Sequence, residues 1–197
     1  NVVNEAALLA VRNGRKKVTM EDFNDAIDKV SIGLKKKSRK ENKKEIRLVS
    51  VHETGHALVA AFTPEHEHVN KITVVPRSHG VGGFTQYREE EEKFIMTRKD
   101  MMNEIDSLLG GRAAEELFVG RISTGAMNDL ERVTKQAYGM IAYAGMSERL
   151  PNLCYYNNNE YSFQRPYSES TAQLIDEEVK LMVNEQYARA KQLLDEH

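Results

Sequence analysis

Two histidines in this chain have the spacing of a metal site on a helix. His52 and His56 lie four residues apart, so a helix would place both imidazole rings on one face, one turn apart, within reach of one metal ion. Glu53 follows the first histidine and is placed to reach a water molecule on that metal. The stretch HETGH therefore matches the HExxH pattern of zinc peptidases.

This pattern predicts separate roles for the zinc ion and for Glu53. A catalytic zinc takes three protein ligands and leaves a fourth position for water, whose pKa it lowers to about 7. Glu53 would accept the proton from that water as a general base and return it to the leaving amine. A metzincin would need glycine at position 59 and histidine at position 62, and the residues there are Val59 and Phe62. That class of zinc peptidase is excluded.

The residue pattern alone leaves the third ligand open. Three histidines beyond Pro64 lie in a polar stretch, where hydrated histidine is the common case; they are His66, His68 and His79. Carboxylates on later predicted helices are better candidates, and these are Glu115 and Glu116 in GGRAAEEL and Asp129 in STGAMNDL. Asp129 stands near a helix start, where the helix dipole favours an anion, so it also fits an ordinary first-turn acid.

The composition favours a soluble, helix-rich fragment. Of 197 residues, 40% are hydrophobic and 29% charged, and the net charge of −2 gives no case for a nucleic-acid partner. The single cysteine, Cys154, cannot form an internal disulfide, so a zinc site here must use histidine and carboxylate. No apolar run reaches the roughly 18 residues of a membrane span, and no signal peptide opens the chain. The start at Asn1 suggests a piece of a longer protein.

Helical periodicity dominates the elements that must position these residues. Residues 1–32 predict two helices, the second beginning at Thr19 and Asp22, and a strongly basic stretch follows at residues 35–44. A helix that begins near Asn42 and stops before Pro64 would carry HETGH. Three later helices are predicted, at residues 98–118, 130–144 and 174–194.

A small hairpin is the predicted β-structure. The runs at residues 71–75 and 81–87 are rich in β-branched and aromatic residues and are separated by Pro76 and a glycine-containing turn. Gly82 and Gly83 would weaken the second strand and indicate a bulge or a close backbone approach. The fold class is therefore mainly α (α+β), with a small hairpin or sheet.

Several blocks of sequence together resemble one family, the FtsH-type AAA+ zinc proteases. The blocks are HETGHALVAAF, KITVVPR, GGFTQY, GGRAAEELFVG and STGAMNDLERVTKQAYGMIAYAGMS, in that order. The preceding VVNEAALLAVRNGRKKVTMEDFNDAIDKV resembles the end of the helical lid of the family's ATPase module. We therefore expect a lid remnant at residues 1–32, a basic linker at 33–44 and a zinc peptidase domain at 45–197.

The resemblance assigns roles that the residue pattern left open. It implies one zinc per chain, with Asp129 as the third ligand beside the two histidines. It implies that Glu115 holds a zinc histidine from behind, without touching the metal. Substrate would add as a strand along residues 81–87, so the candidate substrate-strand residues are Gly82, Gly83, Phe84 and Thr85.

The resemblance also implies a larger machine. Members of the family are membrane-anchored homo-hexamers that use ATP and magnesium to pull unfolded or membrane proteins into a proteolytic chamber. We expect the full-length protein at the bacterial inner membrane, with the protease domain facing the cytoplasm and the anchor outside this fragment. No GxxxxGK[ST] loop occurs here, so ATP and magnesium would bind only the full-length protein. Gly33-Leu34 replaces the family's glycine-proline near the junction.

Two alternatives remain at this point. The chain could be a catalytically silent module that builds the ring through its helices, although the intact HETGH and Asp129 argue against that interpretation. It could also be a thermolysin-like enzyme in which Glu115 is the third zinc ligand.

Overall fold

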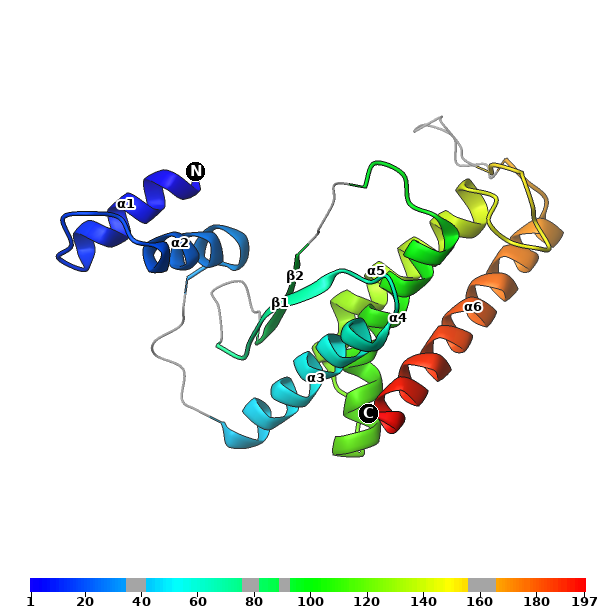
Figure 1. Ribbon diagram of the computed structural model, residues 1–197. Helices are drawn as coiled ribbons and strands as arrows, with labels where there is room; N and C mark the ends of the chain where they lie inside the picture. The colour runs from blue at the N-terminus through cyan, green and yellow to red at the C-terminus, as the bar shows by residue number, and fades with distance from the viewer. Residues whose placement is uncertain (35–41, 76–81, 89–92, 156–165) are drawn as a thin grey trace.

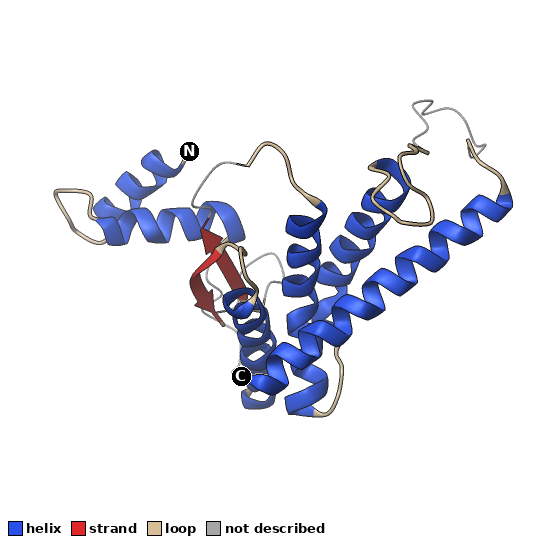
Figure 2. Cartoon of the chain, turned by 45° about the vertical axis from the view of Figure 1, so that its right-hand side comes forward, coloured by secondary structure: helices blue, strands red, loops and turns tan. Residues whose placement is uncertain are grey.

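A computed structural model describes residues 1–34, 42–75, 82–88, 93–155 and 166–197 of the chain. The described chain is mainly helical with one small sheet (Figures 1 and 2). The elements run in the order α1 (Val2–Arg12), α2 (Met20–Ile32), α3 (Lys43–Phe62), β1 (His68–Thr73), β2 (Phe84–Arg88), α4 (Arg98–Ala114), the π-helix η1 (Glu115–Val119), the 3₁₀ turn η2 (Thr124–Ala126), α5 (Met127–Tyr138), the π-helix η3 (Gly139–Tyr143) and α6 (Glu169–Glu196). The predicted fold class is confirmed.

Helices α1 and α2 form the expected hairpin. The Thr19 side chain accepts the Asp22 amide, and the Asp22 carboxylate accepts the Thr19 amide at 2.9 Å, which closes a capping box at the start of α2. Small residues pack the hairpin, with Ala6, Ala10 and Ala26 buried. Figure 1 shows the hairpin set apart from the other helices, and residues 35–41 of the expected basic linker lie outside the described residues.

Helix α3 begins where the sequence predicts. The Asn42 side chain caps it by accepting the Lys44 amide, and the helix runs through HETGH to Phe62. Against α4 its backbone makes direct contact, because a Cβ built on Gly55 would lie 2.4 Å from the carbonyl oxygen of Gly110. Helix α4 continues unbroken past this glycine to Ala114. The glycine pair at 110–111 therefore marks tight packing and does not break the helix.

The sheet is an antiparallel pair whose register runs from His68 opposite Arg88 to Thr73 opposite Phe84. Its irregularity lies in β1 between Val69 and Lys71, so of the two outcomes expected at the glycines of the second run, a bulge or a close approach, the bulge is not found in the described chain. Gly82 and Gly83 precede β2 and approach side chains of α3 instead. Residue 81 of the expected strand lies outside the described residues.

The apolar core forms where α3, α5 and α6 pack on α4. Its largest buried side chains belong to α3, α4, α5, η3 and α6, and they are Val59, Ile105, Leu109, Val133, Met140, Ile141 and Ile175. Helices α4 and α5 each continue into a π-turn, so the predicted helices at 98–118 and 130–144 exist but change winding near their ends. No helix among the described residues is long and apolar enough to cross a bilayer.

Candidate metal centre

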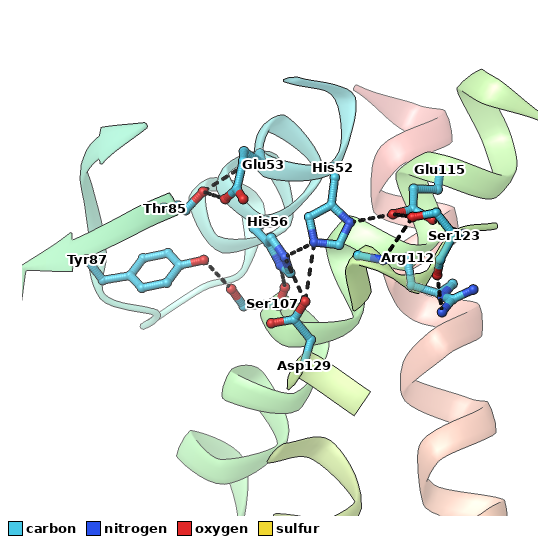
Figure 3. Close-up of polar contacts among 11 residues, drawn as sticks. His52, Glu53, His56, Thr85, Tyr87, Ser107, Arg112, Glu115, Ser123 and Asp129 are labelled. Atoms are coloured by element: carbon cyan, nitrogen blue, oxygen red, sulfur yellow. Dashed lines mark hydrogen bonds and ion pairs between the residues drawn. The ribbon is translucent and has the colours of Figure 1, made fainter. Parts of the chain in front are cut away.

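Three side chains from two helices converge on one point. Helix α3 presents His52 and His56 side by side, both buried, and the first turn of α5 presents Asp129 (Figure 3). The two Nε2 atoms are 2.9 Å apart, and Asp129 Oδ2 lies 3.3 Å from His52 Nε2 and 3.5 Å from His56 Nε2. One ligand atom from each residue falls within 4.8 Å of the others. The structure thus brings together the three residues expected as ligands.

The partners of the two Nδ1 atoms define the chemistry of this cluster. His52 Nδ1 lies 2.8 Å from Glu115 Oε1, and His56 Nδ1 lies 2.7 Å from the carbonyl oxygen of Ser107. Both partners are acceptors, so each neutral ring carries its proton on Nδ1 and turns the lone pair of Nε2 toward the cluster. Two lone pairs and the Asp129 carboxylate then face one another without a hydrogen to share. Such an arrangement suits a cation between them.

The charges of the cluster depend on one another. Burial by itself would lower the pKa of His52, but the hydrogen bond that the protonated ring would donate to Asp129 and the charges of Asp129 and Glu53 outweigh it and raise that pKa. Burial would raise the pKa of Asp129, but the hydrogen bonds and charges of both histidines hold it well below its usual range. Asp129 is therefore an anion at neutral pH, as a metal-binding carboxylate must be.

Glu115 lies behind His52, on the side away from the cluster. It stands at the junction of α4 and η1, where Ser123 donates its amide to Oε2 at 2.7 Å and its hydroxyl to Oε1 at 2.9 Å. Arg112 in turn donates to the Ser123 carbonyl oxygen at 3.0 Å. These bonds fix the Glu115 carboxylate against His52 Nδ1, which orients the imidazole ring.

Glu53 is also buried and lies beside the cluster. Burial raises the pKa of its carboxyl above the ordinary value, against the lowering effects of a hydrogen bond from Thr85 and of the nearby histidines. Thr85, on β2, donates its hydroxyl to Glu53 Oε2 at 2.8 Å. A buried carboxylate of raised proton affinity next to a cation site has the properties of a general base.

Gly111 provides the space in which the imidazole rings meet. A Cβ built on this glycine would lie 2.5 Å from His56 Nε2 and 2.6 Å from His52 Nε2. No side chain heavier than hydrogen fits there without moving the rings. The two adjacent glycines of α4 thus have different roles. Gly110 lets the main chain of α3 pack closely against α4, and Gly111 leaves space for the imidazole rings of His52 and His56.

Other predicted candidates lie elsewhere. Glu116 contacts the hydroxyl of Tyr187 and the ammonium of Lys191 on α6. The ring of His66 stacks edge-on against Tyr87, with ring centroids 5.2 Å apart. His68 belongs to β1, and His79 lies outside the described residues.

Sequence reasoning missed several residues that support the cluster. They are Ser107, Gly111 and Ser123, together with Tyr87, whose hydroxyl lies 2.9 Å from the Ser107 Oγ atom. A serine that caps a turn, as Ser123 caps η2, has a local signal that predicts the cap but no distant partner. Thr85 was expected in the substrate strand, and its bond to Glu53 was not foreseen.

The donor set fits zinc. Two imidazole nitrogens and a carboxylate oxygen are among the ligand types that zinc takes, and three protein ligands leave one position for water, as in catalytic zinc sites. Glu115 and the Ser107 carbonyl supply the outer hydrogen bonds that metal-bound histidines usually make. The side chains of His52, His56 and Asp129 therefore match the ligand types and number of a catalytic zinc, and the Glu53 carboxylate lies beside them.

Comparison with known proteins gives a consistent answer. A model of peptidase family M41 matches residues 39–197. The ATP-dependent zinc metalloprotease FtsH of Parabacteroides distasonis is 49% identical over 199 residues, which cover 100% of this chain and 29% of that relative. The proteins of the same name from Rhodothermus marinus and Thermotoga maritima are 46% and 43% identical, covering 100% and 98% of this chain. The chain spans 29% and 33% of the length of these two relatives.

Proposed function

This chain belongs to peptidase family M41, and on that premise we propose that it is the zinc endopeptidase part of a membrane-anchored, ATP-dependent protease. Unfolded or membrane proteins would be its substrates. His52, His56 and Asp129 would hold the zinc ion, one per chain, and Glu53 would be the general base. The name of these relatives, ATP-dependent zinc metalloprotease, supports this proposal.

One observation carries the proposal furthest. Both histidines have their Nδ1 atoms engaged by acceptors, so both Nε2 lone pairs point at the Asp129 carboxylate with no proton between them. Only a cation or an extra proton relieves the repulsion among these donors. The buried Glu53 lies next to the same point, which supplies the base that peptide hydrolysis needs.

The reaction follows from these positions. Zinc, when bound, supplies Lewis acidity that makes water nucleophilic near neutral pH and stabilises negative charge on a carbonyl oxygen. Glu53 accepts the proton of the attacking water and later hands it to the leaving amine, so the base is restored at the end of each cycle. Glu115 and the Ser107 carbonyl keep the two imidazole rings oriented throughout.

We propose that substrate binds in extended form along β2. Within the described residues β2 pairs with β1 on one side, and its sequence neighbours Gly82 and Gly83 lie against α3 near Glu53. An added strand there would present its peptide bonds to the site through main-chain hydrogen bonds, which accept many sequences. Gly82, Gly83, Phe84 and Thr85 would line this path.

The remaining parts of the machine are proposed for the full-length protein. These are a homo-hexameric ring, a membrane anchor, an ATP- and magnesium-dependent motor, and a position at the bacterial inner membrane with the peptidase on the cytoplasmic side. The α1–α2 hairpin would be the end of the motor's lid (1–32), joined by a linker (33–44) to the peptidase domain (45–197). The description of the relatives as ATP-dependent supports the motor.

Zinc content and cleavage of an unfolded protein test the enzyme. We expect the chain to bind one zinc and to cleave casein, and Glu53→Gln to keep the zinc while losing cleavage by at least about 100-fold, the usual effect of removing a general base. A chain without zinc, or cleavage that survives in Glu53→Gln, would leave the ring-assembly module as the better description.

The zinc affinities of two variants test which residue is the third ligand. Asp129→Ala should weaken zinc binding more than Glu115→Ala, since the first change removes a ligand and the second only the group that orients His52. Zinc affinity is measured by competition with a chelator. A larger loss in Glu115→Ala would favour the thermolysin-like alternative.

A further inference from the structure

We infer that Thr85 is a positioning residue for the general base, an inference that rests on the proposed function and deepens it. Thr85 lies in β2, and Glu53 lies in α3, so the contact joins the sheet to the catalytic helix. Its hydroxyl holds one carboxylate oxygen of Glu53 and leaves the other for proton transfer. The side chain thus acts on the base, although the residue was expected only as part of the substrate strand.

The contact between Thr85 and Glu53 is double. The Thr85 hydroxyl lies 2.8 Å from Glu53 Oε2 and 3.1 Å from the Glu53 carbonyl oxygen. A hydroxyl has one proton, and both acceptors belong to Glu53, so the proton serves Glu53 in either orientation. Figure 3 shows the threonine reaching from the strand to Glu53, on the side away from Glu115.

Gly83 shapes the other side of the Glu53 carboxylate. A Cβ on Gly83 would lie 2.8 Å from Glu53 Oε1 and 2.6 Å from its Cγ. The absence of a side chain therefore leaves room beside Oε1, while Thr85 engages Oε2. The segment 83–85 thereby distinguishes the two oxygens, and Oε1 is the one available to take a proton from water.

The same face of β2 also supports the metal ligands. Tyr87, two residues after Thr85 and on the same face of the strand, contacts the Ser107 hydroxyl at 2.9 Å. The Ser107 carbonyl oxygen in turn accepts the Nδ1 proton of His56. The strand proposed to receive substrate is therefore attached to both the base and a ligand. A shift of β2 would move the Glu53 carboxylate through Thr85.

Three variants separate this role from substrate binding and from general stability. Thr85→Val removes the hydroxyl but keeps a β-branched side chain of similar shape that suits a strand. Thr85→Ser keeps the hydroxyl. Thr73→Val is the control, because it makes the same chemical change at the β1 residue paired with Phe84. The Thr73 hydroxyl accepts the Val75 amide and, within the described residues, has no hydrogen bond to Glu53.

The expected results are specific. In Thr85→Val we expect kcat for casein or a fluorogenic peptide to fall about 10-fold, in line with the loss of one hydrogen bond to a charged group. KM and zinc content should not change. Thr85→Ser should recover most of kcat, and Thr73→Val should behave like the unchanged protein. Thr85→Ala should repeat the loss, which keeps the test valid if valine disturbs the strand.

Other results would overturn the inference. A loss confined to KM would make Thr85 a substrate contact, and a loss of zinc would make its role structural. Full activity in both Thr85→Val and Thr85→Ala would show that Glu53 needs no such support. If the protein without any substitution showed no Glu53-dependent cleavage, the proposed function and this inference would both be overturned. Each of the other results overturns the inference alone.

Discussion

Gly111 is the residue at which a single methyl group should have the largest effect on metal binding. Its missing side chain leaves room for two imidazole nitrogens, at 2.5 and 2.6 Å from where a Cβ would stand. We expect Gly111→Ala to separate His52 from His56 and to weaken zinc binding by at least about 10-fold, the scale reported for disturbed metal surroundings. Zinc titration measures the loss, and circular dichroism should show that the helices remain.

Gly139→Ala is the matched control for this substitution. Gly139 is also helical, and a Cβ built there would meet no atom within 4 Å. Alanine favours a helix over glycine by about 1 kcal/mol, so this variant should keep its zinc and its stability. Equal zinc affinity in the two alanine variants would contradict the prediction.

The sequence predicts residues of this site unevenly, for physical reasons. The spacing of His52 and His56 is a local property of a helix and can be read directly. Asp129 was one of several carboxylates until the family resemblance assigned it. The bond from Thr85 to Glu53 joins segments whose approach depends on the folded sheet, and no local pattern contains that information.

At the scale of elements, the α4–α6 interface contains a buried carboxylate. Asp106 has no exposed surface, and its partner is the Arg189 guanidinium, whose Nη1 lies 3.3 Å from Asp106 Oδ2. Burial raises the pKa of Asp106 to about 7, with Arg189 acting in the opposite direction. The interface therefore holds a proton near neutral pH that the unfolded chain releases at about pH 4.

This interface should make stability depend on pH. Between about pH 4 and 7 the folded state holds more protons at Asp106 than the unfolded state, so the free energy of unfolding falls as the pH rises through that window. At about 1.4 kcal/mol per pKa unit, the full change would be up to about 4 kcal/mol. Asp106→Asn should remove this dependence, so its free energy of unfolding should exceed that of the unchanged protein by more at pH 8 than at pH 5, as urea denaturation would measure.

Asp195→Asn, on the helix α6 that carries Arg189, provides the matched comparison. Asp195 is exposed, so its amide should leave the pH dependence of unfolding as it was. If the stability difference between Asp106→Asn and the unchanged protein were the same at pH 5 and pH 8, the buried carboxylate would have no part in the effect.

The elements themselves were predicted better than their details. Capping residues gave the starts of α2 and α3, since Thr19 with Asp22 and Asn42 act within one turn. The π-turn that begins at Glu115 was not foreseen, because its residues would suit an α-helix equally well. Packing in the folded protein decides the winding there. The irregularity of the sheet between Val69 and Lys71 was not foreseen, whereas Gly82 and Gly83 show the close approach that was one of their two expected outcomes, here to side chains of α3. A side chain at position 83 would collide with the Glu53 side chain, so glycine is needed there for contact with α3 and not for the geometry of the sheet.

At the scale of the whole molecule, the α1–α2 hairpin and the metal centre should be independent. An ion pair between Lys71 Nζ and Asp28 Oδ2, at 2.7 Å, joins the hairpin to β1, and such pairs at partly exposed sites contribute about 1 kcal/mol or less. The hairpin also has buried alanines of its own. We expect a chain that starts at residue 35 to keep its zinc and to change its melting temperature by less than about 4 °C.

Lys71→Ala in the complete chain is the control, because it removes the ion pair without removing the hairpin. Its melting temperature should match that of the shortened chain. Loss of zinc on shortening would contradict the proposed division at residues 33–44 and would show that the hairpin takes part in forming the peptidase domain.

The contact between Gly55 and Gly110 has a consequence for how this protein can change over evolutionary time. Main-chain atoms meet there directly, so the distance between α3 and α4 at the level of the histidines does not depend on the size of any intervening side chain. Apolar residues farther along the same interface, such as Val59 and Ile105, fill space without setting that distance. Lineages can therefore exchange core residues while His52 and His56 stay in place, and sequence divergence should concentrate away from these two glycines.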